Sequence, residues 1–307
     1  MQTSKGRLQL PNGSGAYIYR WLPDAKTRAA VQIIHGMAEH GGRYARLAQA
    51  LTAAGYAVYA QDLPGHGQTA EKESDLGHFA DREGFHYALD CVHAVNRYIA
   101  GELKDPRLFV LGHSMGGYFL QHYVGEYPRD LDGAIFSGTS GDLGPLRAIG
   151  LALIRAEGLL LGKRRRSFLG EQLSFKEFNK KFQPAQTPFD WLSRDPLEVK
   201  RYMSDERCGF RCSCGLWCDL LKACADLQSV ERVKLVRKEM PVLIIAGAED
   251  PATQGEKGVR SLEKLYRKAN LKDVGVRIYP GARHELFNET CRDEVTQDLL
   301  DWLNQHL

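Results

Sequence analysis

The stretch at residues 109–117 constrains this chain more than any other part of the sequence. An apolar run is followed by Gly-His-Ser-Met-Gly at residues 112–116 and then by residues 118–124, which are compatible with a helix. A strand, a sharp turn and a helix in this order hold a serine hydroxyl clear of a sheet, and the glycines let strand and helix pass closely. The pattern predicts that Ser114 is a nucleophile. It also predicts that the N–H of Met115, at the start of the helix, faces a developing oxyanion.

Composition indicates which class of protein contains this turn. A chain of 307 residues, with 43% hydrophobic and 26% charged residues, is ordinary for a globular protein with one large domain and room for an insertion. Its net charge of +3 is too small to indicate nucleic-acid binding, and residues 1–17 lack the apolar segment of a secretory signal. No apolar stretch reaches the length of a membrane span, so the sequence predicts a soluble, cytoplasmic protein.

Strand and helix signals alternate on both sides of the serine turn. An N-terminal hairpin is predicted at residues 6–10 and 16–22, around the turn-rich residues 11–15, and buried strands are predicted at residues 29–34, 56–60, 108–111, 131–137, 241–247 and 274–280. Helices are predicted between them, at residues 44–54, 84–99, 258–268 and 289–307. This order is typical of an α/β fold, with a mainly parallel sheet and helices on both faces. Residues 141–236 interrupt it with mostly helical sequence, so we interpret 1–140 and 237–307 as the core and 141–236 as an inserted cap.

A serine nucleophile needs a general base and an acid that orients the base. Asp250 follows the strand signal at 242–245 and is our choice for the acid, although Glu249 stands beside it. The alternative role of Asp250 is to cap a helix. His284 follows the strand signal at 276–279, where a histidine is otherwise a solvated surface residue. Because serine, acid and histidine come in this order along the chain, the sequence predicts a catalytic triad.

The loop after the first buried strand offers the second donor of an oxyanion hole. His35-Gly36-Met37 places the N–H of Met37 there, to act with that of Met115, and the alternative is a plain glycine turn. Four histidines, at positions 35, 40, 66 and 113, lie on separate loops without the spacing of a zinc site. We therefore expect these histidines to brace loops by hydrogen bonds, and we expect no metal and no cofactor.

Four motifs together resemble the monoacylglycerol lipase and lysophospholipase group of α/β-hydrolases. They are His-Gly-Met-Ala-Glu-His-Gly-Gly-Arg-Tyr at 35–44, Asp-Leu-Pro-Gly-His-Gly-Gln-Thr at 62–69, the serine turn at 112–117 and Gly-Ala-Arg-His at 281–284. The resemblance covers roughly residues 15–140 and 238–307. It implies an eight-stranded α/β-hydrolase sheet with a helical cap. It also implies a serine esterase that cleaves carboxylic esters of lipids, monoacylglycerols or lysophospholipids, through an acyl-enzyme.

The resemblance also assigns site residues. It matches the nucleophile to Ser114, the acid to Asp250, the base to His284 and the oxyanion amides to Met37 and Met115. The same resemblance predicts substrate-binding residues around the head group, with a structural ion pair as the alternative role of the two charged ones: Gly36, Glu39, Arg43 and Phe287. Lipases of this group that prefer monoglycerides commonly carry a further histidine where this chain has Phe287. That departure concerns the glycerol preference and leaves the ester chemistry untouched.

The predicted cap has two features of its own. Residues 146–154 and 159–161 are apolar and residues 163–166 are basic, which is typical of an element that contacts lipid, or of a packed helix followed by a solvated turn. Of the seven cysteines, five lie between Cys208 and Cys224 without a Cys-x-x-Cys pair, so we expect structural thiols on cap helices in a reducing compartment. Trp191 is expected to be a core residue that anchors the cap helices.

Several functions remain open at this point. Besides the lipid esterase, the sequence permits a general carboxylesterase on short-chain or aryl esters, a serine peptidase or amidase, and a catalytically silent binding protein. The partners expected from the resemblance are a lipid ester substrate, a second copy of the chain in a homodimer and a peripheral membrane contact through the cap, with no nucleic acid.

Overall fold

One sheet of eight strands forms the centre of the molecule. The computed structural model describes residues 1–9, 15–141, 144, 146–227 and 230–307, so most of the predicted hairpin turn lies outside the described residues. The strands are β1 (Gln2–Gln9), β2 (Gly15–Leu22), β3 (Ala29–Ile34), β4 (Tyr56–Gln61), β5 (Leu108–His113), β6 (Gly133–Ser137), β7 (Val242–Gly247) and β8 (Val274–Tyr279). Their order in the sheet is β1-β2-β4-β3-β5-β6-β7-β8. β1 pairs with β2 and β2 with β4 antiparallel, and all other neighbours are parallel, which confirms the predicted sheet.

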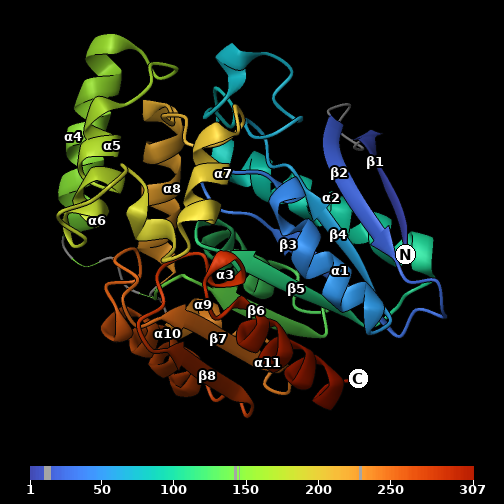
Figure 1. Cartoon of the computed structure of the whole chain (residues 1–307). Coiled ribbons are helices and arrows are strands. Elements are labelled where there is room, and N and C mark those ends of the chain that lie inside the picture. The colour runs from blue at the N-terminus through green and yellow to red at the C-terminus, as the bar shows by residue number, and fades with distance from the viewer. Residues whose placement is uncertain (10–14, 142–143, 145, 228–229) are drawn as a thin grey trace.

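Helices cover both faces of this sheet (Figure 1). α1 (Ala45–Ala53) and α11 (Arg292–Gln305) pack on the face that carries Val31 and Ile33. α2 (Gly84–Leu103), α3 (Met115–Glu126) and α10 (Glu256–Lys268) pack on the other face, against Ile34 and Val110 among others. Because successive side chains of a strand point to opposite faces, strands covered on both sides are buried on both and are mostly apolar. β3 and β5 are accordingly buried at every position.

The chain between β6 and β7 is helical. Its elements are α4 (Leu146–Leu161), α5 (Phe168–Gln172), α6 (Phe175–Lys180), α7 (Pro196–Ser204), α8 (Cys214–Asp226) and α9 (Val230–Val233), with a 3₁₀ turn, η3 (Asp190–Leu192). Within its described residues the only β pairing is a single bridge between Arg166 and Ser213. Figure 1 shows α4 to α8 gathered together beside the sheet. The helical character expected for 141–236 is present, whereas the division into core and cap stays a prediction.

The cysteines and the apolar helix of this segment can now be placed. None of the seven cysteines, all of them among the described residues, forms a disulfide bond. Cys214, Cys218 and Cys224 lie on α8, but Cys208 and Cys212 lie in the loop before it, so the expectation that all five sit on helices is wrong for those two. None of the described helices is both long and apolar enough to cross a membrane.

The parallel strands bring distant loops to one edge of the sheet. The loops after β3, β5, β7 and β8 leave from the carboxyl ends of strands in the parallel part of the sheet, β3-β5-β6-β7-β8. They carry, in this order, residues 35–37, Ser114, Asp250 and His284. The topology therefore assembles at one edge all the residues to which the sequence assigned chemistry.

Candidate active site

Ser114 occupies a strained turn between β5 and α3. Its backbone has φ 51° and ψ −116°, a left-handed conformation that costs a residue with a side chain about 1–3 kcal/mol. A Cβ added to Gly112 would lie 2.4 Å from the carbonyl oxygen of Gly116, and one added to Gly116 would lie 2.1 Å from that of Ile34. Both glycines are therefore required, as the sequence predicted. The Ser114 side chain is partly exposed.

His284 and Asp250 form a buried hydrogen-bonded pair. Nδ1 of His284 lies 2.8 Å from Oδ2 of Asp250, and the other carboxylate oxygen accepts the N–H of Ala252 at 2.8 Å. Because a carboxylate only accepts, the proton lies on Nδ1 and the lone pair is on Nε2, for which the described part of the chain offers no hydrogen-bond partner. Glu249 points elsewhere, since it is exposed and pairs with Lys181 at 2.8 Å.

The surroundings of His284 set its protonation. Burial by itself lowers the pKa of His284, but the adjacent Asp250 carboxylate opposes it and the net pKa is raised above its usual value. The rings of His113 and Trp191 pack against that of His284, with centroids 4.7 and 4.9 Å away. Burial, followed by the charge of His284, lowers the pKa of His113 to about 4, so His113 stays neutral and adds no second cation.

Ser137 and Gly138 place Ser114 close to His284. The N–H of Ser114 donates to the carbonyl of Ser137 at 2.8 Å, and a Cβ added to Gly138 would lie 3.2 Å from Nδ1 of His284. Among the described residues no hydrogen bond joins the Ser114 hydroxyl to His284. Such bonds are often long before substrate binds and tighten in the complex.

The loop after β3 presents a backbone amide beside Ser114. A Cβ added to Gly36 would lie 3.2 Å from Cβ of Ser114. Nδ1–H of His35 donates to the carbonyl of Gly36 at 2.7 Å, while its Nε2 accepts the N–H of Leu63 at 2.9 Å. Since C=O and N–H point in opposite directions in a trans peptide, the N–H of Met37 is directed away from His35. This ring is neutral, because burial lowers the pKa of His35 to about 3.

The two amides predicted for an oxyanion hole are unused in the free protein. Within the described part of the chain, neither the N–H of Met37 nor that of Met115 has a protein acceptor. A free N–H at a helix N-terminus and another on an adjacent loop are the donors that such a hole requires. Their role stays a prediction that this geometry supports.

A charged network lies directly behind this loop. Arg43 contacts Glu39 at 2.9 Å and Glu285 at 2.5 and 2.7 Å; both carboxylates are buried and the Arg43 side chain is 10% exposed. The ion pair that the sequence left as an alternative for Glu39 and Arg43 is present. The sequence missed its third member, whose only signal was its place directly after His284. Phe287 packs into the core around α1 and α11. Substrate binding by Gly36, Glu39, Arg43 and Phe287 stays a prediction.

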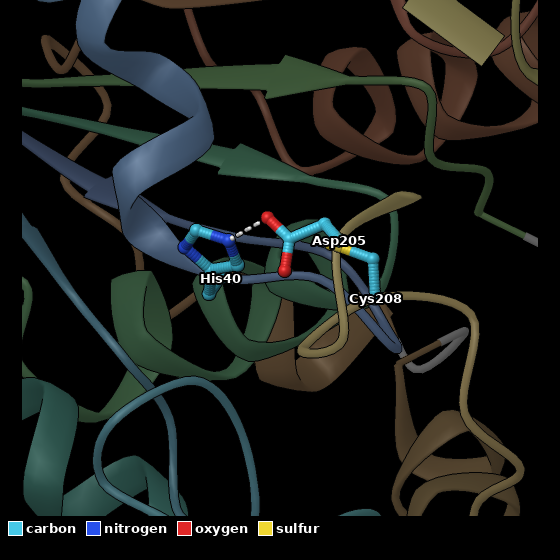
Figure 2. A group of neighbouring side chains, drawn as sticks. All are labelled: His40, Asp205 and Cys208. Atoms are coloured by element: carbon cyan, nitrogen blue, oxygen red, sulfur yellow. Dashed lines mark hydrogen bonds and ion pairs between the residues drawn. The ribbon is translucent and has the colours of Figure 1, made fainter. Parts of the chain in front are cut away.

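A second cluster offers ligand atoms for a metal. His40, from the loop after β3, meets Asp205 and Cys208, from the loop after α7, and one ligand atom of each lies within 4.8 Å of the others (Figure 2). However, Nδ1 of His40 accepts the N–H of Gly42 at 3.1 Å, so Nε2 carries the proton and donates to Asp205 at 2.9 Å. Burial also raises the pKa of the Cys208 thiol, whereas a metal needs the thiolate. The group fits a brace between loops better than an ion site.

An apolar pocket begins at Met37, in the loop after β3. It has a volume of about 50 Å³ and is lined by Met37 together with residues of the helical segment and the loop before α8, among them Phe175, Phe189, Phe210 and Trp217. Trp191 is buried against Phe175 and Phe178 in an aromatic cluster that adjoins the pocket through Phe175, and it is a core residue, as the sequence predicted. Apolar side chains therefore approach the site from the segment between β6 and β7.

Comparisons with known proteins agree with this geometry. A model of the family described as serine aminopeptidase, S33, matches residues 25–291. A monoacylglycerol lipase from Mycolicibacterium smegmatis is 29% identical over 287 residues, which are 94% of this chain and 92% of that protein. A monoglyceride lipase from Homo sapiens is 28% identical over 305 residues, which cover 96% of this chain and 88% of that one.

A solved structure extends the agreement to the fold. The carboxyl esterase from Bacillus coagulans, determined in complex with glycerol, has a TM-score of 0.89 and 27% identity, with 99% of both chains covered. The family match includes the loops that carry Ser114, Asp250 and His284. The chain therefore belongs to the serine aminopeptidase S33 family of α/β-hydrolases.

Proposed function

We propose that this carboxylic-ester hydrolase cleaves lipid esters, monoacylglycerols or lysophospholipids, with Ser114 as its nucleophile. The observation that carries the proposal is the buried His284–Asp250 pair, whose Nε2 has no partner among the described residues and whose ring is linked to the strained Ser114 turn through Ser137 and Gly138. The relatives named as monoacylglycerol and monoglyceride lipases support the lipid ester as the substrate class.

The proposed reaction uses these groups in sequence. Nε2 of His284 takes the hydroxyl proton as Oγ of Ser114 attacks the ester carbonyl carbon, while Asp250 keeps the other proton on Nδ1 and stabilises the imidazolium. The N–H groups of Met37 and Met115 donate to the oxyanion. His284 then gives its proton to the leaving alcohol. It next takes a proton from water, which attacks the acyl carbon, and returns that proton to Oγ of Ser114 as the bond to the fatty acid breaks.

The acyl chain has a natural place beside the oxyanion loop. We place it in the apolar pocket that begins at Met37 and is lined by Phe189, Phe210 and Trp217. Its volume of about 50 Å³ is far below the roughly 300 Å³ of a small ligand site, so a long chain requires the surrounding helices to separate. Short esters are therefore expected to meet less resistance than long ones in the closed arrangement.

The family takes its description from an aminopeptidase, and the site argues against that chemistry here. A peptidase that recognises a free amino terminus needs a carboxylate to bind the ammonium group. The two buried carboxylates beside the site, Glu39 and Glu285, are both paired with Arg43, so neither is free for that role. We therefore assign ester substrates, and comparison of p-nitrophenyl esters with aminoacyl anilides tests the choice.

A membrane contact is proposed for the outer face of α4. Only Ile154 and Gly158 of this helix are buried, and Leu159 and Leu160 are 77% and 84% exposed. Residues 163–166 add basic charge at the end of the helix. Apolar residues beside basic ones suit an anionic bilayer, whereas a homodimer through the same face is the competing outcome.

Binding to vesicles tests that contact. Vesicles of phosphatidylcholine with phosphatidylglycerol should sediment the protein, and the double change Leu159→Ser and Leu160→Ser should release it. Leu235→Ser, at a 62% exposed leucine outside α4, is the matched control. Unchanged binding in the α4 variant, or a dimer of the unchanged protein in light scattering that this variant abolishes, rejects the membrane assignment.

Replacement of the nucleophile tests the proposed function itself. Ser114→Ala should lose all measurable turnover of monoacylglycerols, lysophospholipids and aryl esters, together with labelling by a fluorophosphonate probe. Ser204→Ala, at an exposed serine of α7, should keep both. Retained ester hydrolysis by pure Ser114→Ala protein would falsify the assignment of the nucleophile. Absence of any ester turnover by the unchanged protein would reject the activity.

A further inference from the structure

Glu285 has no part in the triad or the oxyanion hole, yet it contacts the machinery behind both. We propose that Glu285 is a positioning residue for the reaction, which acts through Arg43 and Glu39 to hold the Gly36 peptide beside Ser114. This inference rests on the function proposed above. It adds a residue that connects the loop that carries His284 to the loop that carries Met37, whose N–H we assign to the oxyanion hole.

The first link joins the loop of the base to η1 (Gly41–Tyr44). The guanidinium of Arg43 meets the Glu285 carboxylate with two nitrogens, Nη1 to Oε1 at 2.5 Å and Nη2 to Oε2 at 2.7 Å. Paired contacts of this kind fix direction as well as distance. Asn288 donates a further hydrogen bond to Glu285 at 3.1 Å, so the carboxylate is itself held in place.

The second link passes from Arg43 to the backbone of the oxyanion loop. Nη1 of Arg43 lies 2.9 Å from Oε2 of Glu39, and Oε1 of Glu39 accepts the N–H of Gly36 at 2.6 Å. The Tyr44 hydroxyl donates to the same oxygen at 2.9 Å. A turn of the Glu39 carboxylate would release the Gly36 N–H, and this peptide immediately precedes the Met37 amide that we assign to the oxyanion.

Charge balance explains how Glu285 affects Glu39 and the Gly36 N–H through Arg43. One guanidinium is shared by two buried carboxylates, Glu39 and Glu285. With Glu285 neutral, Arg43 keeps a single anion and is drawn toward Glu39, which is the side chain that holds Gly36. The ring of Tyr202 lies 4.8 Å from the guanidinium and cannot replace a charge that is lost. The Glu285 carboxylate thus keeps Arg43 from shifting toward Glu39.

Glu285 also bears on the base through its charge. The groups that face His284 are the Asp250, Glu285 and Glu39 carboxylates and the neutral His113, and of the three carboxylates Asp250 has the largest effect in raising the pKa of His284. Removal of the Glu285 charge therefore lowers the pKa of His284. A purely structural contribution of Glu285 would leave the pH profile unchanged, so the profile separates the two roles.

The test compares Glu285→Gln with Glu198→Gln. Glu198 is a matched control because it too is a buried carboxylate paired with arginine, in its case Arg46 and Arg201 at 2.6 Å each, and it lies on α7, outside the loops that carry the triad. Glu285→Gln should lower kcat for a p-nitrophenyl ester by about 10- to 100-fold with little change in KM, because the loss is confined to the transition state. Its acid limb of kcat/KM should move to lower pH. Glu198→Gln should lower the melting temperature and leave kcat and the profile as they are.

Two further variants keep the inference open to rejection if Glu285→Gln folds poorly. Glu285→Asp should restore the acid limb, because it keeps the charge. Arg43→Lys should lower kcat without moving that limb, because lysine keeps the charge but cannot contact both oxygens of Glu285 with two nitrogens. If Glu285→Gln and Arg43→Lys both retain the kcat of the unchanged protein, the inference is wrong while the proposed function stands. If the unchanged protein hydrolyses no ester, the proposed function is what fails.

Discussion

Two histidine–aspartate pairs lie on loops at the same end of the sheet, and the roles that we propose for them differ. In one, His284 lies 2.8 Å from Asp250 with side chains that are 3% and 0% exposed. In the other, His40 lies 2.9 Å from Asp205 with side chains that are 15% and 35% exposed. The hydrogen bonds have nearly equal lengths, so length does not distinguish a catalytic pair from a structural one.

The difference lies in the second ring nitrogen. Both nitrogens of His40 are engaged, one by Asp205 and the other by the N–H of Gly42. His284 uses only Nδ1, and its Nε2 has no partner within the described residues. A histidine can accept a proton only through a free lone pair, so the first pair fits catalysis and the second fits a link between the sheet and the helical segment.

Loss of the Asp250 carboxylate is expected to have the largest effect on kcat. Asp250→Asn should lower kcat by about 10⁴-fold, because an amide can stabilise the wrong tautomer of His284 and carries no charge for the imidazolium. Steady-state kinetics on a p-nitrophenyl ester, with circular dichroism to confirm folding, measure it. A variant with more than a tenth of the original kcat contradicts the assignment of the acid.

The pH profile sharpens the same comparison. Burial lowers the pKa of His284 but Asp250 outweighs it, so the net pKa is raised, and the protonated ring cannot accept the serine proton. The acid limb of kcat/KM should therefore lie above the usual histidine pKa of about 6.5 and fall about tenfold per pH unit below it. Substrate-saturation measurements across pH 5–9 decide this; an acid limb below 6 would show that burial dominates.

The second pair should matter for stability more than for turnover. Asp205→Asn keeps an acceptor for His40 and removes a charge that is partly screened by solvent, so the free energy of unfolding should fall by about 0.5 kcal/mol. Thermal and urea denaturation measure that loss. We expect kcat to change less than twofold, and a tenfold loss would mean that the two pairs are not separate in function.

The smallest effect is expected next to the acid. Glu249→Gln removes only a surface contact with Lys181, and both side chains of that contact are more than 40% exposed. Turnover and melting temperature should match those of the unchanged protein within error. A marked loss of kcat would show that the acid had been assigned to the wrong member of the two adjacent carboxylates.

How much of the site could be predicted depended on how far apart in the sequence the interacting residues lie. Ser114, Asp250 and His284 each follow a strand, and parallel topology then brings strand ends together, so local signals located them. The contact of Arg43 with Glu285 spans 242 positions and that of His40 with Asp205 spans 165. No local pattern encodes such pairs, because they depend on how loops pack after the sheet has formed.

Element ends were missed for a related reason. The closing helix was predicted from Glu289 but begins at Arg292. The Glu289 carboxylate is fully buried and accepts N–H groups of Arg194, Arg283 and Thr290, so it serves as a local hub rather than as the first turn of a helix. Two of those donors come from other parts of the chain, which periodicity cannot reveal.

The left-handed backbone of Ser114 has a consequence for anyone who would alter this enzyme. Glycine is the one residue that adopts such angles without strain, so Ser114→Gly would relax the turn and make the chain harder to unfold. Heat tolerance and reactivity thus pull in opposite directions at a single position. A screen that selects for stability on heating, without selecting for turnover, would therefore favour stable variants that lack activity.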